Sequence, residues 1–99
     1  MRYAPPSTQS LAMLKETLGY KGSQMADLFG VSSDKQWRKY TGGTRPREVS
    51  AHMLFFAMAR LILKQKDIEA VLEKMREGGA EIDLNASPAS PEQDGEPQP

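Results

Sequence analysis

Two short apolar-patterned segments separated by one glycine constrain this chain more than any other feature of its sequence. In residues 23–29 the apolar side chains recur at helical spacing, and Gly30 follows directly. Glycine after a helix tolerates the left-handed conformation that turns the chain. Ser33 is followed three residues later by Gln36, the pattern of a capping box. The sequence therefore predicts a helix, a tight turn and a second helix over residues 33–41.

A further helix is expected ahead of this pair. Leu11, Leu14 and Leu18 recur at i, i+3 and i+7, which is one apolar stripe of a helix. Serine is a favoured N-cap because its hydroxyl accepts a hydrogen bond from a backbone N–H of the first turn. We therefore assign the N-caps of the first two helices to Ser10 and Ser23.

Two more helices are expected after the pair. One runs from about Arg47 to Leu63, with Pro46 in its first turn. It is apolar almost all round, so it must be covered on more than one side. The last helix has a charged outer face and apolar positions at Ile68, Val71, Leu72 and Met75. The predicted fold class is all-α, with five helices and no strand.

Charge divides the chain into a basic domain and an acidic tail. The net charge is zero, but residues 1–79 hold all 13 Lys and Arg and only eight of the 13 Asp and Glu, a formal charge of +5. The other five acids lie in residues 80–99, whose proline-rich end lacks large apolar side chains. Such a segment cannot bury enough surface to order itself. We expect a flexible arm at 1–10, a folded domain at 11–79 and a disordered acidic tail at 80–99.

The cations of the domain concentrate on the second helix of the pair and on the connector that follows it. Residues 35–47 contain no acid, and their cations are Lys35, Arg38, Lys39, Arg45 and Arg47. Trp37 and Tyr40 lie three residues apart and are expected to face the core. The cations then face outward, and such a concentration of exposed positive charge is typical of phosphate binding.

The stretch from Ser23 to Glu48 resembles the lambda-repressor-like (Xre-type) helix-turn-helix family. The similarity runs through Ser23-Gln24, Ala26, Gly30-Val31-Ser32, Trp37, Tyr40 and Gly43-Thr44-Arg45-Pro46. With the flanking helices it covers residues 11–63. It departs in one place, because one extra residue lies between Val31 and Trp37.

The resemblance implies a DNA-binding transcriptional regulator, most often a repressor of a phage, plasmid or bacterial operon, that reads the major groove with helix 33–41. In this family the residue at Gln24 bonds a phosphate, residues 33–35 and Arg38 approach base edges, and the connector clamps phosphate. Asp34 is the odd member, because a carboxylate is repelled by phosphate, and such a residue more often caps the helix N-terminus than reads a base. The expected DNA-binding residues are Gln24, Ser33, Asp34, Lys35, Gln36, Arg38, Lys39, Arg45 and Arg47.

A homodimer is expected because one core of this size is marginal and the fourth helix has apolar groups on several sides. Two copies would place two recognition helices about 34 Å apart on an inverted repeat of double-stranded DNA. The predicted interface residues are Leu54, Phe55, Met58, Leu61, Ile62, Ile68, Leu72 and Met75.

Alternative functions remain open at this point. The same domain occurs in antitoxins, where the acidic tail would bind a basic protein partner, and in small terminase-like subunits of viral DNA packaging. Trp37 and Tyr40 could instead be stacking platforms for single strands.

We expect no enzyme, metal site or cofactor, since the chain has no Cys and His52 is its only histidine. We also expect no membrane segment or signal peptide, and therefore a cytoplasmic location.

Overall fold

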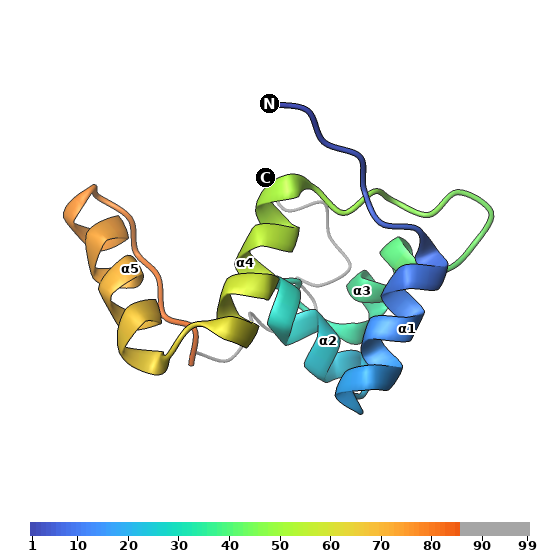
Figure 1. The fold of residues 1–99 in the computed structure, drawn as a ribbon, viewed down its shortest axis with the longest axis horizontal. Helices are drawn as coiled ribbons and strands as arrows, with labels where there is room; N and C mark the ends of the chain where they lie inside the picture. Colours follow the sequence, from blue (N-terminus) through green and yellow to red (C-terminus); the bar gives the residue numbers. More distant parts are fainter. Residues whose placement is uncertain (86–99) are drawn as a thin grey trace.

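The computed structural model describes residues 1–85, which form five helices and no strand (Figure 1). The helices are α1 (Thr8–Leu18), α2 (Gly22–Phe29), α3 (Asp34–Thr41), α4 (Ala51–Ile62) and α5 (Gln65–Glu77). The predicted all-α class is thus confirmed over this range. Most of the predicted acidic tail, residues 86–99, lies outside the described residues.

The core lies around α2, which packs against α3 on one side and α4 on another, while α1 covers α3. In Figure 1, α1, α2 and α3 form one group, and α5 stands apart at the opposite end of the long axis. The Trp37 indole lies at the centre of the core, with its ring 4.7 Å from that of Phe29. The buried residues of this core are Leu11, Met25, Ala26, Leu28, Phe29, Trp37, Val49 and Ala57.

The turn between α2 and α3 has the predicted construction. Gly30 has a φ of +72°, in the left-handed region, and the Val31 N–H donates to the Ala26 carbonyl at 2.8 Å. At the start of α3 the Ser33 hydroxyl accepts from the Gln36 N–H at 3.2 Å. Both contacts satisfy backbone groups that a helix end leaves unpaired, so they fix the angle at which α3 leaves α2.

Replacing Gly30 by alanine is expected to destabilise the fold by about 1–3 kcal/mol. A side chain in the left-handed region costs roughly 1–2 kcal/mol, and a Cβ here would also lie 3.3 Å from Phe56 Cε2. Gly19→Ala is the matched control, because Gly19 has a φ of +69° with nothing within 4 Å of its added Cβ. Urea denaturation should show the larger loss for Gly30→Ala. Equal losses would mean that the Phe56 side chain moves away from the added Cβ without loss of stability.

The starts of the first two helices differ from the prediction. The predicted cap Ser10 lies inside α1, because the Ser7 hydroxyl accepts from the Ser10 N–H at 3.0 Å and caps the helix one turn earlier. The predicted cap Ser23 lies inside α2, whose N-cap is Lys21. At α1 both Ser7 and Ser10 can cap, and local preference does not choose between them. At α2 the Gln24 side chain accepts from the Lys21 N–H at 2.7 Å, which accompanies a start two residues ahead of the predicted cap.

The predicted start of the fourth helix at Arg47 is wrong, since α4 begins at Ala51 and the Ser50 hydroxyl caps it by accepting from the Met53 N–H at 3.1 Å. The preceding segment is held in a non-helical path by contacts from distant parts of the chain. Val49 is buried in the core, and the Tyr3 hydroxyl donates to the Val49 carbonyl at 2.6 Å. Pro46 therefore belongs to the loop and not to a first helical turn.

The predicted dimer residues divide into two sets. Three of them, Leu54, Met58 and Leu61, are half-buried and pack on the core of their own chain. Leu72 is buried and Ile68 half-buried on α5. The others remain exposed, namely Phe55, Ile62 and Met75.

None of the helices found between residues 1 and 85 combines the length and apolarity that crossing a bilayer demands.

Candidate nucleic-acid interface

An open, basic hollow lies where α3 meets the loop that follows it. Its volume is about 780 Å³, and it is formed by Lys35, Arg38, Lys39, Thr41, Gly42, Gly43, Thr44, Arg45 and Arg47. All five cations of the predicted basic run line it, and no acid does. The fold thus brings together cations from a helix and a loop on one exposed surface.

A backbone contact sets the distance between the loop and the helix. The Arg47 N–H donates to the Lys39 carbonyl at 2.8 Å, so the loop turns back onto the last part of α3 after Gly43, whose φ is +83°. Two residues later the chain is anchored by the burial of Val49. Arg45 and Arg47 are therefore held beside α3 on a loop fixed at its far end.

The outer surface of α3 presents three exposed cations, Lys35, Arg38 and Lys39, while Trp37 between them is only 2% exposed. Arg38 Nε lies 3.7 Å from Asp34 Oδ2, and both side chains are largely open to water. An exposed pair of this kind one helical turn apart contributes about 0.3–0.5 kcal/mol. Arg38 can therefore leave Asp34 for a stronger partner at little cost.

Asp34 has a second neighbour that explains the presence of an acid here. A Cβ added at Gly22 would overlap the Asp34 carboxylate, so this carboxylate lies against the first residue of α2. A helix N-terminus carries partial positive charge and favours an adjacent anion. Asp34 thus connects the start of α3 with the start of α2, and it does not line the basic hollow.

Three other predicted site residues lie elsewhere or are already engaged. The Ser33 hydroxyl caps α3, and Gln36 is half-buried. Gln24 accepts from the Lys21 N–H through Oε1 at 2.7 Å, which leaves its amide NH₂ as a donor. Gln24 lines a separate hollow with Asp27 and Arg60, so the structure does not bring it together with the basic hollow.

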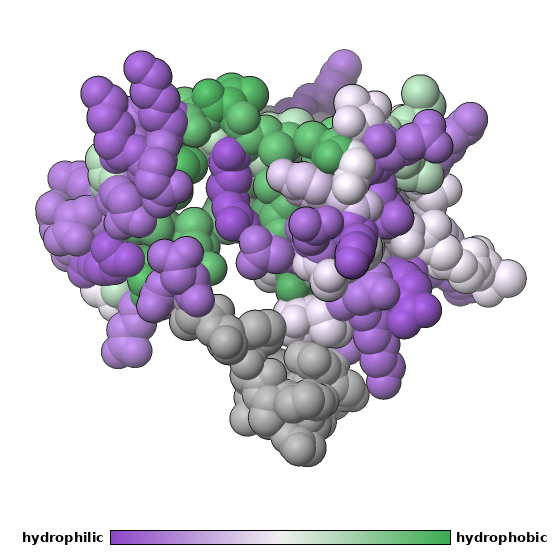
Figure 2. All heavy atoms as spheres, turned by 90° about the horizontal axis from the view of Figure 1, so that it is seen from below, coloured by the Kyte–Doolittle hydropathy of each residue, from purple (hydrophilic) through white to green (hydrophobic). Residues whose placement is uncertain are grey.

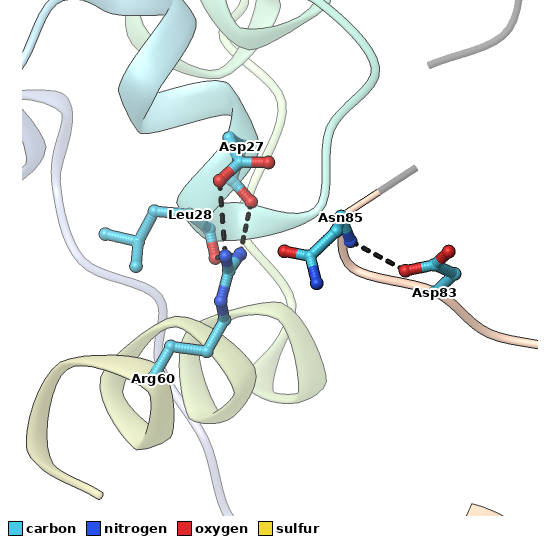
Figure 3. A network of polar contacts seen from close by, with 5 residues as sticks. All are labelled: Asp27, Leu28, Arg60, Asp83 and Asn85. Carbon is cyan, nitrogen blue, oxygen red and sulfur yellow. Dashed lines mark hydrogen bonds and ion pairs between the residues drawn. The ribbon is translucent and has the colours of Figure 1, made fainter. Parts of the chain in front are cut away.

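Arg60 ties α2 to α4, as Figure 3 shows. Its Nη1 donates to the carbonyl of Asp27 at 2.6 Å and reaches that of Leu28 at 3.4 Å, and its Nη2 lies 3.2 Å from the Asp27 carboxylate. The last carbonyls of a helix have no partner within the helix, so Arg60 satisfies the C-terminal end of α2. The guanidinium also lies 5.2 Å from the centre of the Phe56 ring, which favours the charged group further.

The sequence prediction missed two side chains of the hollow, Thr41 and Thr44. Their hydroxyls can donate to phosphate oxygens, as side-chain hydroxyls often do in protein–DNA complexes. The only signal in the sequence for these two threonines was their position within the basic run.

Within residues 1–85 no group of three or more acidic or histidine side chains is arranged to hold a metal ion.

Comparison with known proteins gave no match to any family model, curated protein or solved structure.

Proposed function

We propose that the protein is a sequence-specific double-stranded DNA-binding regulator, with α3 in the major groove. The observation that carries this proposal is the convergence of five cations, without an acid, on one hollow at α3 and the following loop. A helix held by a preceding helix and presented at the surface is the geometry by which helix-turn-helix proteins reach base edges. The lack of cysteine is compatible with a reducing cytoplasm, where such a regulator would act as a repressor by occupying a promoter.

Within the hollow we assign two tasks. Lys35 lies in the first turn of α3 and Arg38 in its last turn, and both side chains are exposed. Such long cationic side chains can pair with guanine O6 and N7. Lys39, Arg45 and Arg47 lie toward the loop and would neutralise phosphates, which sets orientation and most of the non-specific affinity. The residues proposed to read bases are therefore two cations, Lys35 and Arg38, and no longer include Ser33 and Asp34.

Binding to duplex DNA should depend steeply on salt. Three phosphates neutralised per copy give a slope of about −2.7 in log K against log salt, so affinity per copy should fall roughly 40-fold between 50 and 200 mM salt. Fluorescence anisotropy with the DNA upstream of the protein's own gene and with random duplex measures both slope and preference. The expected result is a shared slope with tighter binding to one sequence. Absence of binding to either duplex at low salt would refute the proposal.

A further inference from the structure

The N-terminal arm, residues 1–7, crosses the loop of residues 42–50 that carries Arg45 and Arg47. In Figure 1 the dark blue arm leaves α1 and passes the green loop on its way to residue 1. The two segments are in contact, because the Tyr3 hydroxyl donates to the Val49 carbonyl at 2.6 Å. A segment far away in the sequence therefore holds the end of the loop that follows the two arginines.

The arm has little conformational freedom of its own. Pro5 and Pro6 fix two consecutive φ angles and are both half-buried. On one side the arm enters α1 at Ser7, whose hydroxyl caps that helix. On the other side Met1 lines an apolar groove between α4 and α5, and Figure 2 shows green hydrophobic surface there, beside the purple outer face of α5 at the left. Tyr3 is therefore presented to the loop by a stiff segment.

The loop itself gains little from burial, since residues 42–48 are all exposed. Two hydrogen bonds hold its second half. The Arg47 N–H donates to the Lys39 carbonyl at 2.8 Å, and the Val49 carbonyl accepts from Tyr3. This carbonyl lies ahead of the N-cap Ser50, so α4 has no N–H to offer it. Loss of the Tyr3 hydroxyl would thus remove one of two hydrogen bonds that flank Arg47.

The arm also connects the loop with α3. Helix α1 packs against α3, and the arm continues from α1 to Tyr3. The loop is therefore joined to α3 twice, directly through the bond between Arg47 and Lys39 and indirectly through α1 and the arm. Both connections set the distance between the cations of the loop and those of the helix before a ligand arrives. A binding segment that is already ordered raises affinity, because its ordering entropy is not lost on binding.

We propose that Tyr3 is a positioning residue of the DNA-binding surface, which holds Arg45 and Arg47 at the spacing from α3 that phosphate binding requires. This inference rests on the proposed DNA-binding function and extends it to a side chain outside the basic hollow. Without the Tyr3 hydrogen bond the loop would have to be ordered on binding, but the phosphate contacts would still form in the complex. Affinity for every duplex should then fall while its dependence on salt stays the same.

Fluorescence anisotropy with Tyr3→Phe in the full chain tests this assignment. The variant keeps the ring and loses the hydroxyl, so affinity for the preferred and the random duplex should fall about 2–10-fold, as expected for one net hydrogen bond. The salt slope should stay at the wild-type value, in contrast to Arg47→Ala. Tyr20→Phe is the matched control, since Tyr20 is a half-buried tyrosine outside the hollow. It should leave affinity and slope unchanged.

A double-mutant comparison separates positioning from a general effect on stability. In an Arg45→Ala/Arg47→Ala background, Tyr3→Phe should change affinity by less than about 2-fold, because the cations that it positions are absent. A loss in that background as large as in the wild type would overturn the assignment, since Tyr3 would then act on the whole fold. An equal loss in Tyr20→Phe would overturn it as well.

Hydrogen exchange of the free protein distinguishes failure of this inference from failure of the DNA-binding proposal. The Arg47 N–H should exchange at least about 3-fold faster in Tyr3→Phe, with the amides of α2 and α4 unchanged. Unchanged exchange, or unchanged affinity of the variant, would overturn the role of Tyr3 while the DNA function stands on the binding of the wild type. If the wild type bound no duplex, the DNA function and the positioning role would both be refuted, and faster exchange would preserve only the contact between arm and loop.

Discussion

Replacing Trp37 by alanine is expected to remove about 3–5 kcal/mol from the free energy of unfolding, because a large buried side chain is lost. The indole is 2% exposed and its ring lies 4.7 Å from that of Phe29 and 6.1 Å from that of Tyr40. The loss combines apolar transfer, a cavity and two aromatic contacts. An 85-residue domain is stable by about 4–13 kcal/mol in all, so this variant is expected to be partly unfolded at 37 °C.

Urea denaturation followed by circular dichroism measures this loss. Trp37→Phe keeps a ring and should cost clearly less, and Met13→Ala, at an exposed position, should stay within about 0.5 kcal/mol of the wild type. The same series decides the role of the aromatic pair. If Trp37 were a stacking platform for single strands, Trp37→Ala would lose single-strand binding and keep its stability. Burial of the indole predicts the opposite.

The local features of the helix pair could be predicted from the sequence because they depend on neighbouring residues. Gly30 turns the chain by its own conformational freedom, and Ser33 caps a helix whose Gln36 N–H is three residues away. The burial of Trp37 follows from its helical spacing with Tyr40. Each of these signals lies within a few residues, so no knowledge of tertiary contacts was needed.

The path between α3 and α4 could not be predicted in the same way. Val49 is buried, and the Tyr3 hydroxyl donates to its carbonyl across 46 residues of sequence. These contacts override the helix preference of the segment.

The sequence also did not predict which side of α4 faces the core. An all-round apolar helix has no preferred inward face, so the pattern did not distinguish Met58, which packs on the core, from Phe55, which is exposed.

The sequence predicted which cations belong to the candidate site, but not which polar side chains lie beside them. The acid-free run gave all five cations that the fold gathers in one hollow. Gln24 and Asp34 were also expected to contact DNA, but neither lines the hollow. Gln24 accepts from the Lys21 N–H and Asp34 lies against Gly22, and these neighbours are known only from the three-dimensional structure. Polar side chains near helix starts are often used by the helices themselves. Lys and Arg side chains are donors only, so they cannot accept from the backbone N–H groups at a helix start.

The second large effect concerns Arg38 and Arg47, whose replacement by alanine should weaken DNA binding in two different ways. Arg38→Ala is expected to reduce affinity for the preferred sequence by 1–3 kcal/mol, about 5–150-fold, with a much smaller loss on random duplex, because a base contact is lost. Arg47→Ala should weaken both duplexes by the same factor and make the salt slope less steep by about 0.9, because a phosphate contact is lost.

Anisotropy titrations on the preferred and random duplexes at several salt concentrations separate the two effects. Lys66→Ala is the matched control, since Lys66 is an exposed cation on α5 outside the hollow. If Lys66→Ala changed binding as much as Arg47→Ala, affinity would arise from diffuse charge and the hollow would not be a site. An equal effect of Arg38→Ala on both duplexes would place its guanidinium on the backbone. Base reading would then fall to Lys35, the exposed cation in the first turn of α3.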